Sequence, residues 1–208
     1  MENKELNEKE SLELITRMIQ NSKKNLELGS WNIFLLWGYL SLVMSVLVLL
    51  LVWQTGYMKW NWLWFAIPLV GFPLQAYLKK KTKLLVRTYT DKVIAEVWGI
   101  IGLFTAVAVL VYGGDAHMTK FIMPIIVLGS GIGVAISGSI ISDKWMRYSG
   151  MISFFLGVFA FRDSTGVTVY EGFYNDYITF IICIVLMFII PGHRLTREAR
   201  RLQKKEVE

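Results

Sequence analysis

The residues of this sequence that could do chemistry are few and lie at the edges of apolar stretches. Glu96 sits inside one such stretch, four residues after Lys92, and Gln75 lies four residues before Lys79 in the preceding stretch. A carboxylate in hydrocarbon costs at least about 2.5 kcal/mol and needs a partner. Antiparallel neighbouring helices would let Gln75 donate a hydrogen bond to Glu96. The two residues are therefore a candidate intramembrane polar pair, serving either as a proton, cation or substrate site or simply as groups that reach headgroup water or a lysine.

A second candidate is a run of small residues within 121–141. These residues recur four apart in two registers, Gly129, Gly133 and Ser137 in one and Gly131 and Ala135 in the other. Small faces let helices approach closely. The run is not a phosphate loop, because no Gly-Lys-Ser or Gly-Lys-Thr follows it. It predicts a helix-packing face, either within the chain, between copies in a homo-oligomer, or along a pore.

The usual signatures of catalysis and metal binding do not occur in the sequence. His117 and His193 are the only histidines and fall on opposite sides of the predicted membrane, so they cannot share a metal. Cys183 is the single cysteine, which excludes an intrachain disulfide and a thiol cluster. No nucleophile motif or glycine-rich dinucleotide loop is present. We therefore expect no catalytic, cofactor-binding or metal residues and no enzyme activity.

The elements that hold these residues are predicted to be transmembrane helices. The chain of 208 residues is 54% hydrophobic and 18% charged, and residues 31–53 contain no Asp, Glu, Lys or Arg. About 20 apolar residues cross a bilayer core. Comparable stretches predict an all-α polytopic bundle whose transmembrane domain, 31–191, has six spans, at about 31–53, 60–78, 93–112, 121–141, 145–161 and 170–190. The last two could instead be tilted, re-entrant or interfacial.

The distribution of basic residues predicts the orientation of these spans. Of the 22 lysines and arginines, only Lys59, Lys120 and Arg162 lie in one set of alternate connections. The others lie in the two tails and in the connections at 79–92 and 142–147. Basic residues are retained on the cytoplasmic side. Both termini are therefore predicted to be cytoplasmic, and the positive charge is expected to meet anionic lipid rather than nucleic acid.

The two tails are candidate partner-binding segments. Residues 1–30 form a polar tail in which residues 7–28 predict an amphipathic helix, with Leu12, Ile15, Ile19 and Leu26 near one stripe. Such a helix either lies at the membrane interface or binds a cytosolic protein. The basic tail 192–208 could contact lipid headgroups or an acidic partner.

A weak internal repeat aligns Trp37-Gly38 with Trp98-Gly99. Four further apolar positions of the first and third spans then match, and Phe65–Pro68 resembles Phe121–Pro124 with a spacing that differs by five residues. The repeat predicts a helical hairpin duplicated in parallel orientation.

One resemblance to a known family is carried by the N-terminal part of the chain, about residues 10–40. The matching segments are Glu10-Ser11-Leu12, Met18-Ile19, Gly29 and Leu35-Leu36-Trp37-Gly38-Tyr39. They resemble a family of small bacterial six-helix inner-membrane proteins, sometimes encoded beside a winged-helix transcription regulator. The resemblance implies a multi-pass protein of the bacterial inner membrane and carries over no site residues.

Two functions follow as hypotheses. The first is a non-enzymatic sensor or accessory subunit that acts through its cytoplasmic tails. The alternative is a small oligomeric transporter or channel that uses Glu96, the small residues of the fourth span and the second span, which Pro68 and Pro73 are expected to kink.

Overall fold

The computed structural model describes residues 8–27, 33–81, 89–112, 120–163 and 169–197, and their regular structure is entirely helical. The α-helices are α1 (Glu8–Glu27), α2 (Ile33–Thr55), α3 (Ala66–Lys81), α4 (Tyr89–Tyr112), α6 (Ile122–Ile140), α7 (Lys144–Asp163) and α8 (Val169–Ile184). A 3-10 helix, η1 (Met58–Phe65), leads into α3, and a π-helix, η2 (Val185–Ile189), continues α8. The all-α class predicted from the sequence is confirmed.

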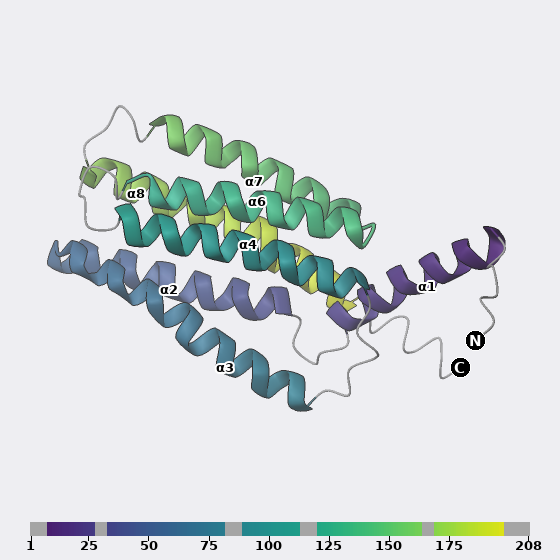
Figure 1. Ribbon diagram of the computed structural model, residues 1–208. Coiled ribbons are helices and arrows are strands. Elements are labelled where there is room, and N and C mark those ends of the chain that lie inside the picture. Colours follow the sequence, from purple (N-terminus) through teal and green to yellow (C-terminus); the bar gives the residue numbers. More distant parts are fainter. Residues whose placement is uncertain (1–7, 28–32, 82–88, 113–119, 164–168, 198–208) are drawn as a thin grey trace.

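Helices α2, α3, α4, α6, α7 and α8 lie side by side and alternate in direction (Figure 1). One end of this bundle carries the starts of α2, α4 and α7 and the ends of α3, α6 and α8. We call it the basic end, because Lys92, Lys144 and Arg147 lie near the helix ends there. Helix α1 projects beyond the basic end and packs against α4. Helix α3 separates from the rest of the bundle as it approaches the basic end.

Four helical segments are long and apolar enough to cross a membrane, namely Ile33–Thr55, Tyr89–Val111, Ile122–Ile140 and Phe173–Arg197. They correspond to the predicted spans 31–53, 93–112, 121–141 and 170–190. The other two predicted spans differ. Residues 60–78 are divided between η1 and the 16-residue α3, and residues 145–161 lie in α7, whose ends carry Lys144, Arg147 and Arg162.

Local sequence sets the ends of these helices. Gly56 terminates α2 with a φ of 70° and donates its amide to the Val52 carbonyl at 2.8 Å, an arrangement that glycine adopts without strain. At the tight connection between α6 and α7, the Asp143 amide donates to the Gly138 carbonyl at 2.8 Å. The Asp143 side chain then accepts the Met146 amide at 2.8 Å and caps α7.

Helix α8 is the central element, and its π-helical segment has a local cause. Pro191 lacks an amide hydrogen and cannot complete the α-helical bond four residues back. The helical turn just before Pro191 is therefore wider, and the Ile190 amide donates to the Val185 carbonyl, five residues back instead of four. The helix then continues to Arg197, so η2 lets one long helix pass a proline.

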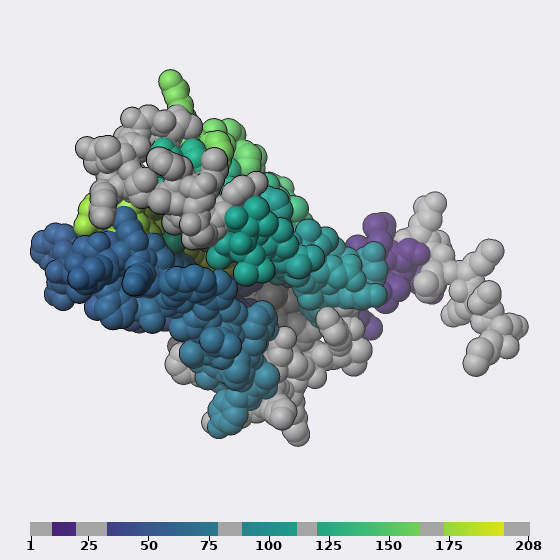
Figure 2. Space-filling model, turned by 60° about the vertical axis from the view of Figure 1, so that its left-hand side comes forward, coloured from purple at the N-terminus to yellow at the C-terminus, as the bar shows by residue number. Residues whose placement is uncertain are grey.

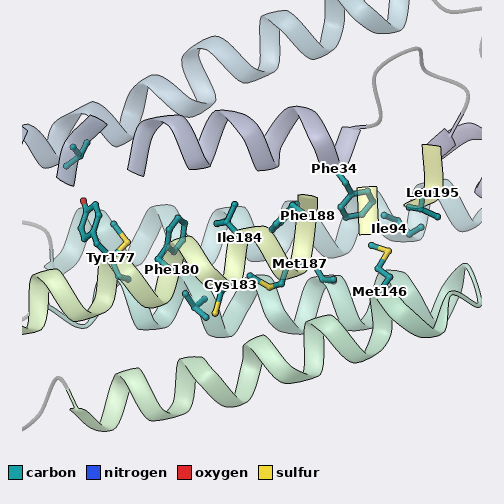
Figure 3. Close-up of a cluster of buried hydrophobic side chains, with 14 of the residues drawn as sticks. Phe34, Ile94, Met146, Tyr177, Phe180, Cys183, Ile184, Met187, Phe188 and Leu195 are labelled. Carbon is teal, nitrogen blue, oxygen red and sulfur yellow. The ribbon is translucent and has the colours of Figure 1, made fainter. Parts of the chain in front are cut away.

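The core surrounds α8 and η2 (Figure 3). Tyr177, Phe180, Cys183, Ile184, Met187 and Phe188 are buried there against α2, α6 and α7. The outer faces of the bundle are apolar as well. Figure 2 shows α3 and α4 on one side of the bundle. Leu69 and Phe72 of α3 and Leu103 and Leu110 of α4 are exposed. Exposed apolar faces on long helices are what a lipid environment requires.

Candidate functional site

Glu96 and Gln75, the predicted polar pair, have different partners in the structure. The Glu96 carboxylate lies 3.8 Å from the Lys92 ammonium, one turn back on α4, and the two side chains are 61% and 66% exposed. Gln75 instead accepts a hydrogen bond from the Trp37 indole at 3.1 Å. The structure does not bring the two together because α3 packs against α2 and diverges from α4 at the basic end (Figure 1). Glu96 is therefore half of an exposed ion pair of low strength.

Gln75 belongs to a contact that occurs twice in the bundle. The Trp37 indole lies over Gly71, where an added Cβ would meet its ring atoms at 2.7 Å, and donates to Gln75 one turn further along α3. The Trp98 indole lies over Gly133, with ring atoms 3.4 Å from an added Cβ, and donates to Ser137 at 3.1 Å, again one turn further along. Each tryptophan thus contacts a glycine on the next long helix and donates a hydrogen bond to the polar residue four positions after that glycine. We call this pair of contacts the tryptophan clamp.

This tryptophan clamp gives the predicted repeat a different register. Each indole donor and its acceptor are separated by nearly the same stretch of chain, 38 residues from Trp37 to Gln75 and 39 residues from Trp98 to Ser137. The sequence comparison instead matched Phe65–Pro68 with Phe121–Pro124. The shared geometry instead aligns Gly71 with Gly133, and Gln75 with Ser137. A hydropathy pattern does not detect this match, because the residues between each glycine and its polar partner are apolar and unrelated. The duplicated hairpin stays a prediction.

The small residues of α6 serve two neighbouring helices. On one side, an added Cβ at Gly131 would lie 2.8 Å from the Phe154 amide nitrogen of α7, and one at Gly150 would fall on the Ala135 backbone. On the other side, Gly129 and Gly133 contact Ile101 of α4. The predicted helix-packing face is thus two faces within one chain. Both faces contact helices of the same chain.

A part-buried polar chain that sequence reasoning missed lies at the end of the bundle opposite α1. The Trp64 indole donates to the Tyr177 hydroxyl at 2.6 Å, and that hydroxyl donates to the Asn61 amide oxygen at 2.6 Å. Tyr177 is 1% exposed, its ring centre lies 4.3 Å from that of Phe173 with the two rings tilted by 35°, and the adjacent Asp176 is also buried. The sequence held two signals of this contact. Asn61 lies between Trp60 and Trp62, and Asp176 and Tyr177 are polar residues near the start of the last apolar span.

The basic end carries a second set of polar contacts, which involve α2, α7 and the helical segment that continues α8. The Tyr39 hydroxyl lies 2.6 Å from His193 Nε2. The Arg194 guanidinium lies 5.3 Å from the centre of the Trp145 ring, and Arg147 lies at the same distance from Tyr148. Among the described residues, no group of three His, Cys, Asp or Glu side chains is placed to hold a metal ion. His117 lies outside the described residues.

Helix α1 presents the predicted apolar stripe to solvent at this end. Leu12 is 65% exposed, Leu14 and Ile15 are also exposed, and Ile19 is half-buried. The helix contacts α4 and extends away from the bundle (Figure 1). The described part of the chain therefore does not cover Leu12 and Ile15 of this apolar stripe.

No family model, curated protein or solved structure matches this chain. The helices and their apolar faces define an integral, multi-pass membrane protein with four candidate spans.

Proposed function

We propose that this is a non-enzymatic membrane protein that acts as a sensor or accessory subunit by binding a cytosolic protein through α1. The observation that carries the proposal is the exposed apolar stripe of α1, which projects from the basic end of the bundle. Amphipathic helices of this kind bind grooves through residues three and four positions apart. The basic end faces the cytoplasm, because lysine and arginine are retained there.

Six spans complete the proposal. Helix α3 follows η1 without a break and α7 has 20 residues, so each element is long enough to reach across the bundle beside its neighbours. An even number of crossings puts both termini on the cytoplasmic side of the inner membrane of a bacterium. The resemblance of residues 10–40 to small bacterial membrane proteins supports the same assignment.

Two of the three features behind the transporter or channel alternative, Glu96 and the small residues of α6, do not favour it. Glu96 is exposed beside Lys92, and the small residues of α6 contact α4 and α7. These groups serve packing and surface pairing.

Site-specific photocrosslinking in cells tests the role of α1. A photoreactive phenylalanine analogue at Leu12 should trap a cytosolic protein, whereas the same analogue at Arg17, on the opposite side of the helix, should not. Leu12→Glu and Arg17→Gln both lower the net charge by one. With the probe at Ile15, only Leu12→Glu should abolish the crosslinked species.

Equal crosslinking at positions 12 and 17 would contradict the proposal, as would crosslinks to lipid alone at position 12. The lipid result would instead make α1 an interfacial helix that lies along the membrane.

A further inference from the structure

The start of α7 and the end of α8 form a corner with a strong excess of positive charge. Lys144 and Arg147 lie in the first turn of α7, and Arg194 and Arg197 lie in the last turns of the helix that continues α8. Asp143 is the nearest acid along the described chain, and it is buried, with its carboxylate engaged by the Met146 amide. The exposed charged side chains of these two segments, Lys144 and Arg197, are basic, and Arg147 and Arg194 are half-buried beside them.

Aromatic rings hold this charge at a defined place. The Arg194 guanidinium lies over the Trp145 ring at 5.3 Å, which joins α8 to α7, and Arg147 lies at the same distance from Tyr148. Met146 and Leu195, next to these basic residues in the sequence, are both buried in the core cluster. Trp145 is 66% exposed and Tyr148 is also exposed. Tryptophan and tyrosine with this exposure are typical of the headgroup level of a membrane.

An exposed apolar stripe leads away from this corner along α7. Tyr148, Ile152, Phe155 and Phe159 follow one another at intervals of three or four residues, and all are exposed. Residues at this spacing share one face of a helix. A cationic headgroup site thus continues directly into a strip that fits an acyl chain.

We propose that the α7–α8 corner binds an anionic phospholipid, with its phosphate at Arg147 and Arg194 and one acyl chain along the α7 stripe. Arginine suits this role because its planar guanidinium donates to phosphate oxygens in pairs. A zwitterionic lipid carries a compensating positive charge, which the four basic residues repel. The inference requires a bilayer around the bundle and does not depend on whether α1 binds a protein.

Native mass spectrometry of the full chain in detergent, titrated with phosphatidylglycerol or with phosphatidylcholine, tests the proposal. The wild-type chain should bind phosphatidylglycerol more tightly. Arg147→Gln and Arg194→Gln should each weaken that binding about fivefold, as expected from about 1 kcal/mol per basic residue near an anionic surface. The matched control is Lys120→Gln, because Lys120 also lies 5.3 Å from an aromatic ring, Phe121, but at the opposite end of the bundle.

Equal loss of affinity in Lys120→Gln, or equal affinity of the wild-type chain for both lipids, would overturn the proposal. Competition by free glycerol phosphate is a further measurement in the same experiment. If it competes with phosphatidylglycerol at similar concentration, the corner binds soluble phosphate and the acyl chain contributes nothing, which also overturns it. Arg194→Lys, which keeps the charge, should retain most of the binding, and it provides a test if Arg194→Gln does not fold.

Discussion

Tyr177 links two segments that lie more than 100 positions apart in the chain. Its hydroxyl accepts from Trp64 and donates to Asn61, and its ring packs against Phe173 and Trp64. A buried donor or acceptor that loses its partner keeps the full cost of its removal from water. The hydroxyl therefore satisfies two part-buried polar groups of η1 in addition to itself.

Tyr177→Phe should lower the free energy of unfolding by about 1–3 kcal/mol, because it removes two part-buried hydrogen bonds, to Trp64 and Asn61, without changing the volume of the core. Reversible denaturation in mixed micelles measures this difference. Tyr174→Phe is the control, since Tyr174 is half-buried on the same helix and packs against Phe173. A loss of stability as large in Tyr174→Phe would show that the polar chain is unimportant.

The contact between α6 and α7 is set by glycine. An alanine at Gly150 would place its Cβ against the Ala135 backbone and 2.7 Å from the Gly131 carbonyl oxygen, whereas an added Cβ at Gly99 of α4 meets nothing within 4 Å. Backbone atoms on both sides leave no flexible side chain to yield. The two glycines are similar in sequence and opposite in environment.

Gly150→Ala should therefore destabilise the protein by about 1–3 kcal/mol through separation of the helices. Gly99→Ala should leave stability unchanged or raise it by up to about 1 kcal/mol, because alanine favours a helix over glycine. The same denaturation measurement compares the two. Similar stability of both variants would mean that α6 and α7 are further apart than the structure places them.

Sequence patterns predicted the helices better than their contacts. The spans at 31–53, 93–112, 121–141 and 170–190 follow from uninterrupted apolar length, which is a local property. The pairing of Glu96 with Gln75 depended on how α3 and α4 diverge, which no local pattern encodes. For the same reason, the spacing of Gly131 and Gly133 indicated close packing but not that each would face a different helix.

At the scale of the whole molecule, the proposed six-span topology assigns sides to exposed residues. Four basic side chains near helix ends are suitable reporters, at Lys59, Lys92, Lys144 and Arg162, and all are exposed. Lys59 and Arg162 belong to the end away from α1, and Lys92 and Lys144 to the basic end. Each can be replaced by a single cysteine in a Cys183→Ser background.

In intact cells, a membrane-impermeant maleimide should label cysteines at positions 59 and 162. Cysteines at positions 92 and 144 should react only after the membrane is opened, because the basic end is cytoplasmic in the proposed topology. The pair 144 and 162 reports on α7 and the pair 59 and 92 on α3. If both cysteines of a pair reacted from the same side of the membrane, the helix between them would not cross the membrane, which would contradict the six-span topology.

The close contact between α6 and α7 also bears on how the chain enters the bilayer during synthesis. Lys144, Arg147 and Arg162 make α7 a poor candidate for insertion as a lone segment. Its partner α6 is strongly apolar, precedes it across a turn of a few residues and packs on its backbone through Gly131 and Gly150. We expect α6 and α7 to leave the translocon together as a preformed hairpin, before α8 completes the core around them.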